Sequence, residues 1–354
     1  MRHSIIKRAA LIMTGALMVI GLSACNSGGT AADSSANSGS PLKELNVALF
    51  PNLTHAQGLV GKNNGDFQKA IGSSTTINWK SYNAGPDETQ AFLTGAEDIG
   101  YIGPGPAITG YVQSHGDIQI VAGSTDGGAL LIARKGAGIK SVKDLAGKKV
   151  AIPQYGNTQH LLLLNLLQKN GLKTADKGGT VTVQQVNNPD VQTLFDKGAL
   201  DAALVPEPWG STLIQKDDAQ VVLDQNALWL NGKYATAVVI ARKDFIKAHP
   251  DVLEKFLKAH VALTDYINKN PQAAQDAINN QINVLTQKKL STDILASSFK
   301  NTTVVNDPSK ASVLDFATFA KDAGYLQGSS DYKTLFDFTA LNKVLKADGK
   351  ATIS

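Results

Sequence analysis

The chain has 354 residues, of which 43% are hydrophobic and 18% are charged, and its formal net charge is +4. This composition is typical of folded globular proteins and excludes a fibrous or disordered chain, and the small net charge gives no indication of a nucleic-acid partner. The length is sufficient for two compact domains, because single cores rarely extend beyond about 100 to 200 residues.

The N-terminal segment 1–24 predicts a secretory signal peptide. Basic residues in the stretch 2–8 precede an apolar run at 9–22 that is too short for an ordinary membrane span. The run ends in Leu22-Ser23-Ala24-Cys25, which resembles a bacterial lipobox, and Cys25 is the only cysteine of the chain. Diacylation there would form a stable anchor, so we expect extracytoplasmic attachment to the cell membrane by lipid alone. The alternative is a plain signal peptide, with Cys25 discarded or left free.

Segment 25–41 is rich in Ser, Gly, Ala and Asn and shows no apolar periodicity. Such a composition cannot bury enough apolar surface to offset the entropy that is lost on ordering. We therefore expect a flexible tether, with folding beginning near Leu42 and no membrane-spanning segment after it.

Strands and helices then alternate along the chain. Short apolar runs at 45–50, 75–79 and 98–102 predict strands, because each is bounded by polar turn residues. Between the second and third strands, Pro86-Asp87 marks the start of a helix and Gly95 marks its end. Proline and acidic residues favour a first helical turn, and glycine favours the position after the last one.

The same order of elements recurs at an offset of 103 residues. The second copy predicts strands at 149–152, 180–186 and 201–205, with a helix that starts at Pro189-Asp190 and ends at Gly198. Strands that alternate with helices indicate parallel sheets covered on both faces, so we expect two α/β lobes; a chance match is the alternative. The identical pairs are Val47/Val150, Ala48/Ala151, Pro86/Pro189, Asp87/Asp190, Phe92/Phe195, Gly95/Gly198, Ala96/Ala199 and Asp98/Asp201.

Three further apolar runs, at 118–123, 129–133 and 235–241, predict strands that cross between the lobes, and a polar loop at 124–128 separates the first two. From residue 244 the apolar spacing becomes helical, and we expect this C-terminal layer to pack on the first lobe. The predicted domains are a first lobe of residues 42–130 and 238–354 and a second lobe of residues 131–237.

Four stretches together resemble a known family. They are Ala84-Gly85-Pro86, the run 98–106 (Asp-Ile-Gly-Tyr-Ile-Gly-Pro-Gly-Pro), the run 139–150 (Ile-Lys-Ser-Val-Lys-Asp-Leu-Ala-Gly-Lys-Lys-Val) and Pro206-Glu207-Pro208-Trp209. On this basis the segment 45–267 is similar to the extracytoplasmic solute-binding proteins for nitrate, taurine and aliphatic sulfonates, a family that also includes binders of thiamine precursors.

The resemblance implies an α/β protein with the two-lobed type II periplasmic-binding-protein fold, in which each lobe is a mainly parallel sheet flanked by helices. A small solute, namely an aliphatic sulfonate, taurine or nitrate, would be held between the lobes and delivered to the permease and ATPase subunits of an ABC importer. The resemblance implies no catalytic residue, cofactor or metal, and we expect a monomer. A binder of a thiamine-precursor-like N-heterocycle is the alternative within the family.

Five loops at the carboxyl ends of the predicted strands form the candidate site, because ligands bind there in open parallel sheets. They span residues 51–57, 103–109, 123–128, 153–160 and 206–211 and contain no Lys or Arg. Backbone N–H groups, helix dipoles and neutral side chains would therefore bind an anion, which suits a singly charged sulfonate or nitrate. The expected ligand-binding residues are Thr54, His55, Gln57, Gly103, Pro104, Gly105, Ser124, Thr125, Asn157, Thr158, Gln159, Glu207 and Trp209.

Several of these residues also have an ordinary structural interpretation. Thr54 and Asn157, which the repeat aligns, are either facing oxyanion clamps or helix caps. The segment 103–106 either brings the backbone close to a ligand or forms a rigid turn. His55 and His160 either donate to an anion or are only solvated.

Glu207 bears on the ligand class, because a carboxylate beside an anion site repels the anion unless the ligand also carries an ammonium or N–H group. An amino-sulfonate or a nitrogen heterocycle meets that condition; the alternative is that Glu207 points to solvent. Trp209 either stacks on the ligand or belongs to the core. For Asp126 we favour capping of the turn at Gly127-Gly128 over a place in the cleft.

An enzyme is the main rival, because this fold also occurs in pyrimidine-synthesising enzymes and in a deaminase with a cysteine-linked cofactor. Those chemistries need cysteine or clustered histidines, whereas the only cysteine here lies in the lipobox. The histidines show neither HxH nor HExxH spacing, and no Walker glycine loop occurs. A sensor or adhesion lipoprotein with the same fold is the other alternative.

Overall fold

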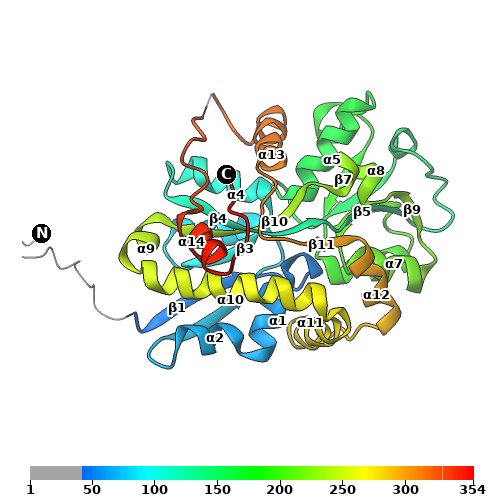
Figure 1. Ribbon diagram of the computed structural model, residues 1–354. Helices are drawn as coiled ribbons and strands as arrows, with labels where there is room; N and C mark the ends of the chain where they lie inside the picture. Colours follow the sequence, from blue (N-terminus) through cyan, green and yellow to red (C-terminus); the bar gives the residue numbers. More distant parts are fainter. Residues whose placement is uncertain (1–41, 329) are drawn as a thin grey trace, which may run out of the picture. The chain divides into compact units, whose positions relative to one another are not determined.

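The computed structural model describes residues 42–328 and 330–354, so the predicted signal peptide, Cys25 and the tether lie outside the described residues. Its strands form two mixed sheets flanked by helices (Figure 1). The first sheet has the order β11-β4-β10-β3-β1-β2, and the second has the order β7-β6-β8-β5-β9. We call each sheet with the helices that follow its strands the first and the second lobe.

The strands of the first sheet are β1 (Glu44–Leu49), β2 (Thr76–Ser81), β3 (Ile99–Ile102), β4 (Ile118–Gly127), β10 (Ala235–Arg242) and β11 (Thr302–Val304). The strands of the second sheet are β5 (Ala129–Ala133), β6 (Lys149–Ile152), β7 (Thr182–Gln185), β8 (Ala202–Pro206) and β9 (Gln220–Leu223).

The helices follow the strands in alternation, as predicted. In the described ranges 42–328 and 330–354, no helix combines the length and apolar character needed to cross a membrane. The helices are, in chain order, η1 (Leu53–His55), α1 (Ala56–Asn64), α2 (Asp66–Ile71), α3 (Gly85–Leu93), α4 (Pro104–Gln113), η2 (Val142–Leu145), α5 (Thr158–Lys169), η3 (Ala175–Lys177), η4 (Asn188–Asp190), α6 (Val191–Asp196), α7 (Trp209–Asp217), α8 (Gln225–Leu228), η5 (Leu230–Gly232), α9 (Lys243–Ala248), α10 (Pro250–Lys269), α11 (Pro271–Thr286), α12 (Thr292–Lys300), α13 (Lys310–Asp322) and α14 (Thr339–Ala347).

Strand pairing confirms the predicted repeat. β1 pairs in parallel with β2 and β3, and β6 pairs in parallel with β7 and β8. The register repeats at the same offset, because Val47 lies opposite Ile99 and Val150 lies opposite Ala202. Each lobe therefore begins with the same three-stranded parallel unit.

The identical residues of the repeat have the same roles in both copies. Asp98 and Asp201 each accept a hydrogen bond at 2.9 Å from a backbone N–H of the first strand of their copy. Gly95 and Gly198 follow the helix before the third strand with φ of 75° and 63°, a left-handed conformation that glycine adopts without strain. The identities thus reflect a common hydrogen-bonding scheme.

β4 is longer than the sequence predicts. A loop was expected at 124–128, but β4 continues to Gly127, and only Gly128 separates it from β5. Two later strands pair with this end of β4: β10 pairs with Thr125 and Asp126, and β11 pairs with Thr125, Asp126 and Gly127. The two sheets therefore meet at Gly128, slightly before the predicted boundary.

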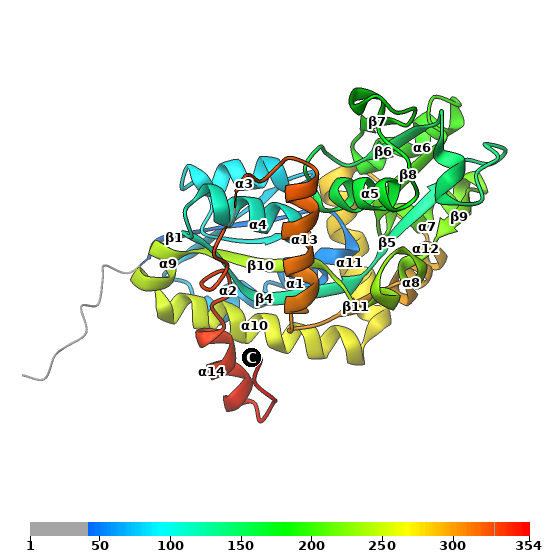
Figure 2. The same cartoon turned by 90° about the horizontal axis from the view of Figure 1, so that it is seen from above.

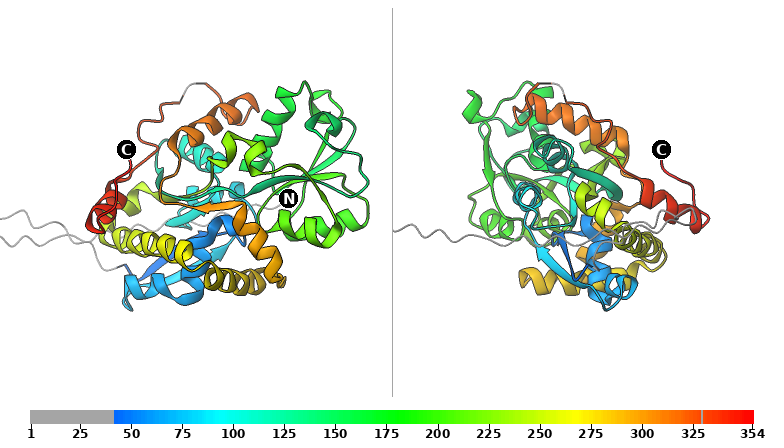
Figure 3. Two further views of the ribbon diagram at one scale, coloured as in Figure 1. Left: turned by 45° about the vertical axis from the view of Figure 1, so that its right-hand side comes forward. Right: turned by 90° about the vertical axis from the view of Figure 1, so that its left-hand side faces the viewer.

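The C-terminal helices pack on both lobes, whereas the sequence predicted packing on the first alone. α10 contacts α1 and α2, and α14 contacts α10 at the side away from the second sheet (Figure 3). α12 contacts α7 of the second lobe, and α13 contacts both α4 of the first lobe and α5 of the second (Figure 2). α10 and α14 therefore pack as expected, while α12 and α13 also contact the second lobe, which the sequence did not predict.

Candidate functional site

A small cavity lies between the lobes, at the carboxyl ends of the strands. Its volume is ≈ 20 Å³, which is close to the space that one water needs. It is lined by Phe50, Asn52, Thr54, His55, Asn83, Ala84, Gly85, Gly103, Pro106, Pro153, Asn157, Thr158, Gln159, Asn188, Pro206 and Thr236.

Helix starts surround this cavity. Asn52, Ala84, Gly103 and Asn157 are the residues immediately before η1, α3, α4 and α5, and all four line it. Among the described residues, no side chain caps η1, α3 or α4. The first N–H groups of a helix have no intrahelical acceptor, and the helix dipole makes that end positive. The cavity is therefore suited to hold a small anion.

Asn157 caps a helix and also lines the cavity. Its Oδ1 accepts a hydrogen bond from the backbone N–H of His160 at 2.8 Å, so it caps α5, and it also lines the cavity. The capping prediction is confirmed, whereas contact with a ligand stays a prediction. Thr54 lines the cavity without capping a helix.

The lining of the cavity carries no formal charge. None of its residues, all within the described part of the chain, is Lys, Arg, Asp or Glu. Burial lowers the pKa of His55 to about 3, so its imidazole is neutral at physiological pH. Its Nδ1 accepts the backbone N–H of Phe50 at 3.0 Å, which leaves the proton on Nε2 as a donor. Neutral donors therefore dominate the site.

Hydrogen bonds join the two lobes at the edges of this cavity. The backbone N–H of Gly105 donates to Thr158 Oγ1 at 3.3 Å, and Asn83 Nδ2 donates to the carbonyl of Pro153 at 3.1 Å. The backbone N–H of Leu53 also donates across the lobes, to the carbonyl of residue 207 at 2.9 Å. The small volume and these bonds show that the lobes are closed.

The structure places six predicted site residues around the cavity: Thr54, His55, Gly103, Asn157, Thr158 and Gln159. Seven others do not line it: Gln57, Pro104, Gly105, Ser124, Thr125, Glu207 and Trp209. Three of these form a buried network behind the cavity. Gln57 Nε2 donates to the carbonyl of Ser124 at 3.0 Å, and Thr125 Oγ1 donates to the carbonyl of Thr54 at 2.8 Å.

Glu207 faces neither the cavity nor solvent, so both interpretations of it need correction. Its side chain is 0% exposed. Its carboxylate accepts hydrogen bonds from the backbone N–H of Ser211 at 2.9 Å, from Ser298 Oγ at 3.3 Å and from Asn301 Nδ2 at 2.6 Å. Burial raises its pKa. Glu207 therefore links α7 to the C-terminal segment around α12. Its partners Ser298 and Asn301 lie far from it in the sequence.

Trp209 belongs to the core and still supports the site. It is 4% exposed, and its Nε1 donates to Oδ1 of the lining residue Asn52 at 2.8 Å. Asp126 is corrected as well, because it lies within β4 and accepts a hydrogen bond from Ser309 Oγ at 2.9 Å. It does not cap a glycine turn.

Three asparagines were missed by the sequence reasoning: Asn52, Asn83 and Asn188 line the cavity. Asn188 is 4% exposed, and its Oδ1 has no hydrogen-bond partner among the described residues. A buried amide oxygen without a partner is costly, so it indicates a group that a ligand or water pairs with. The only signal in the sequence was the position of Asn83 and Asn188, just before the two helix starts of the repeat.

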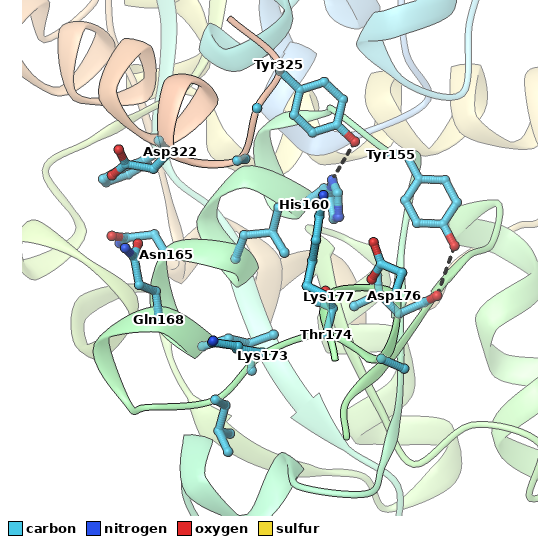
Figure 4. Close-up of a pocket in the computed structure, with 18 of the residues that line it drawn as sticks. Tyr155, His160, Asn165, Gln168, Lys173, Thr174, Asp176, Lys177, Asp322 and Tyr325 are labelled. Atoms are coloured by element: carbon cyan, nitrogen blue, oxygen red, sulfur yellow. Dashed lines mark hydrogen bonds between the residues drawn. The ribbon is translucent and has the colours of Figure 1, made fainter. Parts of the chain in front are cut away.

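A second, larger cavity of ≈ 950 Å³ lies between α5, the segment 171–177 and the end of α13 (Figure 4). His160 belongs here and not to the cavity between the lobes. Burial lowers its pKa to about 4. Helix starts from both lobes converge on the smaller cavity. No cluster of three potential metal ligands occurs among residues 42–328 and 330–354.

Comparisons with known proteins agree with this architecture. The model of the NMT1-like family matches residues 38–282, which is more than half of the chain. The taurine-binding periplasmic protein of Escherichia coli (strain K12) is 26% identical over 228 residues, which cover 64% of this chain and 68% of that protein. A putative aliphatic sulfonates-binding protein of Bacillus subtilis (strain 168) is 23% identical over 344 residues, covering 96% and 97%.

Two solved structures show the same fold at low sequence identity. The periplasmic nitrate-binding protein NrtA from Synechocystis PCC 6803 aligns with a TM-score of 0.72 at 15% identity, covering 86% of this chain and 89% of that one. The periplasmic sulfonate-binding protein SsuA of a putative sulfonate ABC transporter from Methylobacillus flagellatus KT aligns with a TM-score of 0.65 at 18% identity. The alignment covers 88% of this chain and 98% of that one.

Proposed function

The chain belongs to the NMT1-like family, and on this premise we propose that it is the extracytoplasmic solute-binding component of an ABC importer. Its ligand is a small, singly charged anion, with an aliphatic sulfonate or nitrate as the first candidates. One observation carries this proposal: helix starts from both lobes converge on a cavity whose described lining has no charged side chain. The names of the relatives, for taurine, aliphatic sulfonates and nitrate, support the same class.

The neutral lining favours a simple monovalent anion over a zwitterion. The carboxylate of Glu207 accepts hydrogen bonds from Ser211 and Asn301 outside the cavity. No acidic side chain among the described residues that line the cavity is therefore available to an ammonium group. Taurine would have to place its ammonium at a neutral acceptor such as Asn188 Oδ1. A multiply charged anion would receive only neutral donors and helix dipoles. We therefore rank alkanesulfonates and nitrate first, taurine second, and an N-heterocycle third.

Binding requires the closed lobes to separate, because the present cavity has room for about one water. The chain passes directly between the sheets at Gly128 and returns through β10, so the lobes can hinge at these crossovers. Solute capture is therefore an opening and reclosing of the lobes around the anion.

We extend the proposal to location and partners. The related proteins are named periplasmic or belong to an ABC transporter, which supports extracytoplasmic binding and delivery to permease and ATPase subunits. We propose Cys25 as the lipidated anchor, residues 25–41 as its tether, and a monomeric protein with two lobes, bounded near 131 and 237. The relatives are named as binding proteins, and we propose binding without a catalysed reaction.

A thermal-shift screen tests the proposed ligand class. The set is ethanesulfonate, nitrate, taurine, sulfate and a thiamine-precursor pyrimidine. A ligand at 100 times its dissociation constant raises the free energy of unfolding by about 2.7 kcal/mol. We expect ethanesulfonate or nitrate to raise the melting temperature most. A shift with sulfate or the pyrimidine alone would contradict the assignment.

A further inference from the structure

We propose that α13 and the turn after it form a strap that holds the lobes closed, with Tyr325 as the residue that positions the first turn of α5. The strap's effect on solute affinity rests on the proposed function, whereas its effect on closure does not. α13 contacts both α4 and α5 (Figure 2). The starts of α4 and α5 border the cavity from opposite lobes. α13 therefore connects the two lobes outside the cavity.

The contact with the second lobe centres on one hydrogen bond. The hydroxyl of Tyr325 lies 3.3 Å from His160 Nδ1 and shares that acceptor with the backbone N–H of Gly156 at 2.9 Å; the ring centroids are 5.8 Å apart and the ring planes are at 87° (Figure 4). The tyrosine ring also lies against Gly156, because a Cβ at Gly156 would be 2.8 Å from it. His160 directly follows Thr158 and Gln159, which line the cavity. Tyr325 therefore acts on the cavity through α5.

Each lobe contains a buried histidine near a helix start, although the repeat offset aligns His55 with Thr158 and not with His160. In the first lobe, His55 Nδ1 accepts the backbone N–H of Phe50 at 3.0 Å; in the second, His160 Nδ1 accepts that of Gly156 at 2.9 Å. His55 lines the cavity, whereas His160 is covered by Tyr325. The contact that distinguishes His160 comes from a C-terminal segment outside the repeat.

The strap is suited to open reversibly. Tyr325 is 39% exposed, so it can leave His160 without exposing a core. The ≈ 950 Å³ cavity lies between α5 and α13, so part of their facing surfaces is not in contact and separation breaks few contacts there. A single neutral hydrogen bond changes an equilibrium by about two- to tenfold, which is sufficient to bias closure without locking it.

Amide hydrogen exchange without ligand tests the strap. The N–H of Gly105 lies in the first turn of α4 and donates across the lobes to Thr158 Oγ1, so it is protected when the lobes close. We expect Tyr325→Ala to speed its exchange about two- to tenfold, and Tyr325→Phe, which removes only the hydroxyl, to give part of that effect. Tyr266→Ala on α10 is the matched control, because Tyr266 is 37% exposed. Unchanged exchange of Gly105 in Tyr325→Ala, with strand amides as protected as before, would overturn the proposal.

Ethanesulfonate binding separates this inference from the proposed function. If the wild type binds ethanesulfonate, Tyr325→Ala should release it about two- to tenfold faster, and Tyr266→Ala should not. Equal release rates together with unchanged Gly105 exchange would refute the strap and leave the function intact. If ethanesulfonate does not bind, faster Gly105 exchange in Tyr325→Ala still supports the strap.

Discussion

Replacing Glu207 tests whether this carboxylate is structural, as its contacts indicate. In Glu207→Ala, the buried N–H of Ser211 and the amide of Asn301 both lose their acceptor. Each unsatisfied buried donor costs about 1–3 kcal/mol, and the loss of the desolvation penalty of the buried carboxylate offsets part of the total. We therefore expect the free energy of unfolding to fall by about 2–4 kcal/mol. Glu207→Gln keeps one acceptor oxygen and should lose less.

The ligand preference should not change in either variant. Urea denaturation measures stability, and calorimetric titration with ethanesulfonate and taurine measures preference. Glu44→Gln, at an exposed position on β1, is the control for loss of a carboxylate. If Glu207 contacted a ligand ammonium, Glu207→Gln would weaken taurine roughly tenfold to a hundredfold relative to ethanesulfonate. That result, with stability unchanged, would refute the structural role.

Three other predictions concern closure, a buried acid and the anchor. In Gly103→Ala the new Cβ clashes with Thr158 Oγ1 across the closed lobes, so solute binding should weaken about fivefold to a hundredfold by calorimetry. Adding Thr158→Ala removes the clash together with the acceptor of the Gly105 N–H, so it should restore only part of the affinity. No weakening in Gly103→Ala would contradict the closed geometry. Glu88 is buried without hydrogen-bond partners among the described residues, and burial and then Glu97 raise its pKa. Because its pKa in the folded state exceeds the unfolded value of 4.5, the free energy of unfolding should fall as pH rises above about 4.5. Glu88→Gln should flatten this dependence of stability on pH in a series of denaturation curves. An unchanged pH dependence would argue against the role of Glu88. Cys25→Ala should release the protein from membranes or block its processing, and fractionation with membranes as before would count against the lipid anchor.

The repeated parallel units were predictable because their signals are local. Short apolar runs, Pro-Asp helix starts and terminal glycines each lie within a few residues of the structure they specify. Gly95 and Gly198 show this directly, since both adopt the left-handed conformation expected after a helix. The succession of strands and helices along each copy of the repeat followed from these signals.

The site was predicted only in part, because some of its determinants are distant in sequence. The carboxylate of Glu207 accepts hydrogen bonds from Ser298 and Asn301, and the end of β4 pairs with β11. Residues near Glu207 or β4 in the sequence therefore could not indicate the orientation of this side chain or the length of this strand. Asn52 and Asn83 lie in loops and Asn188 begins the short helix η4, and at such positions a short polar side chain follows no periodic pattern. The helix starts, in contrast, pointed to Thr54, Gly103 and Asn157, which line the cavity.

The most direct test of the account is a crystal structure of the protein with ethanesulfonate. We predict the sulfonate between the lobes, with its oxygens accepting N–H groups from the first turns of η1, α3 and α5, and with no carboxylate in contact. Ethanesulfonate bound instead in the cavity between α5 and α13, or a sulfonate contacted by a charged side chain, would contradict the central claim.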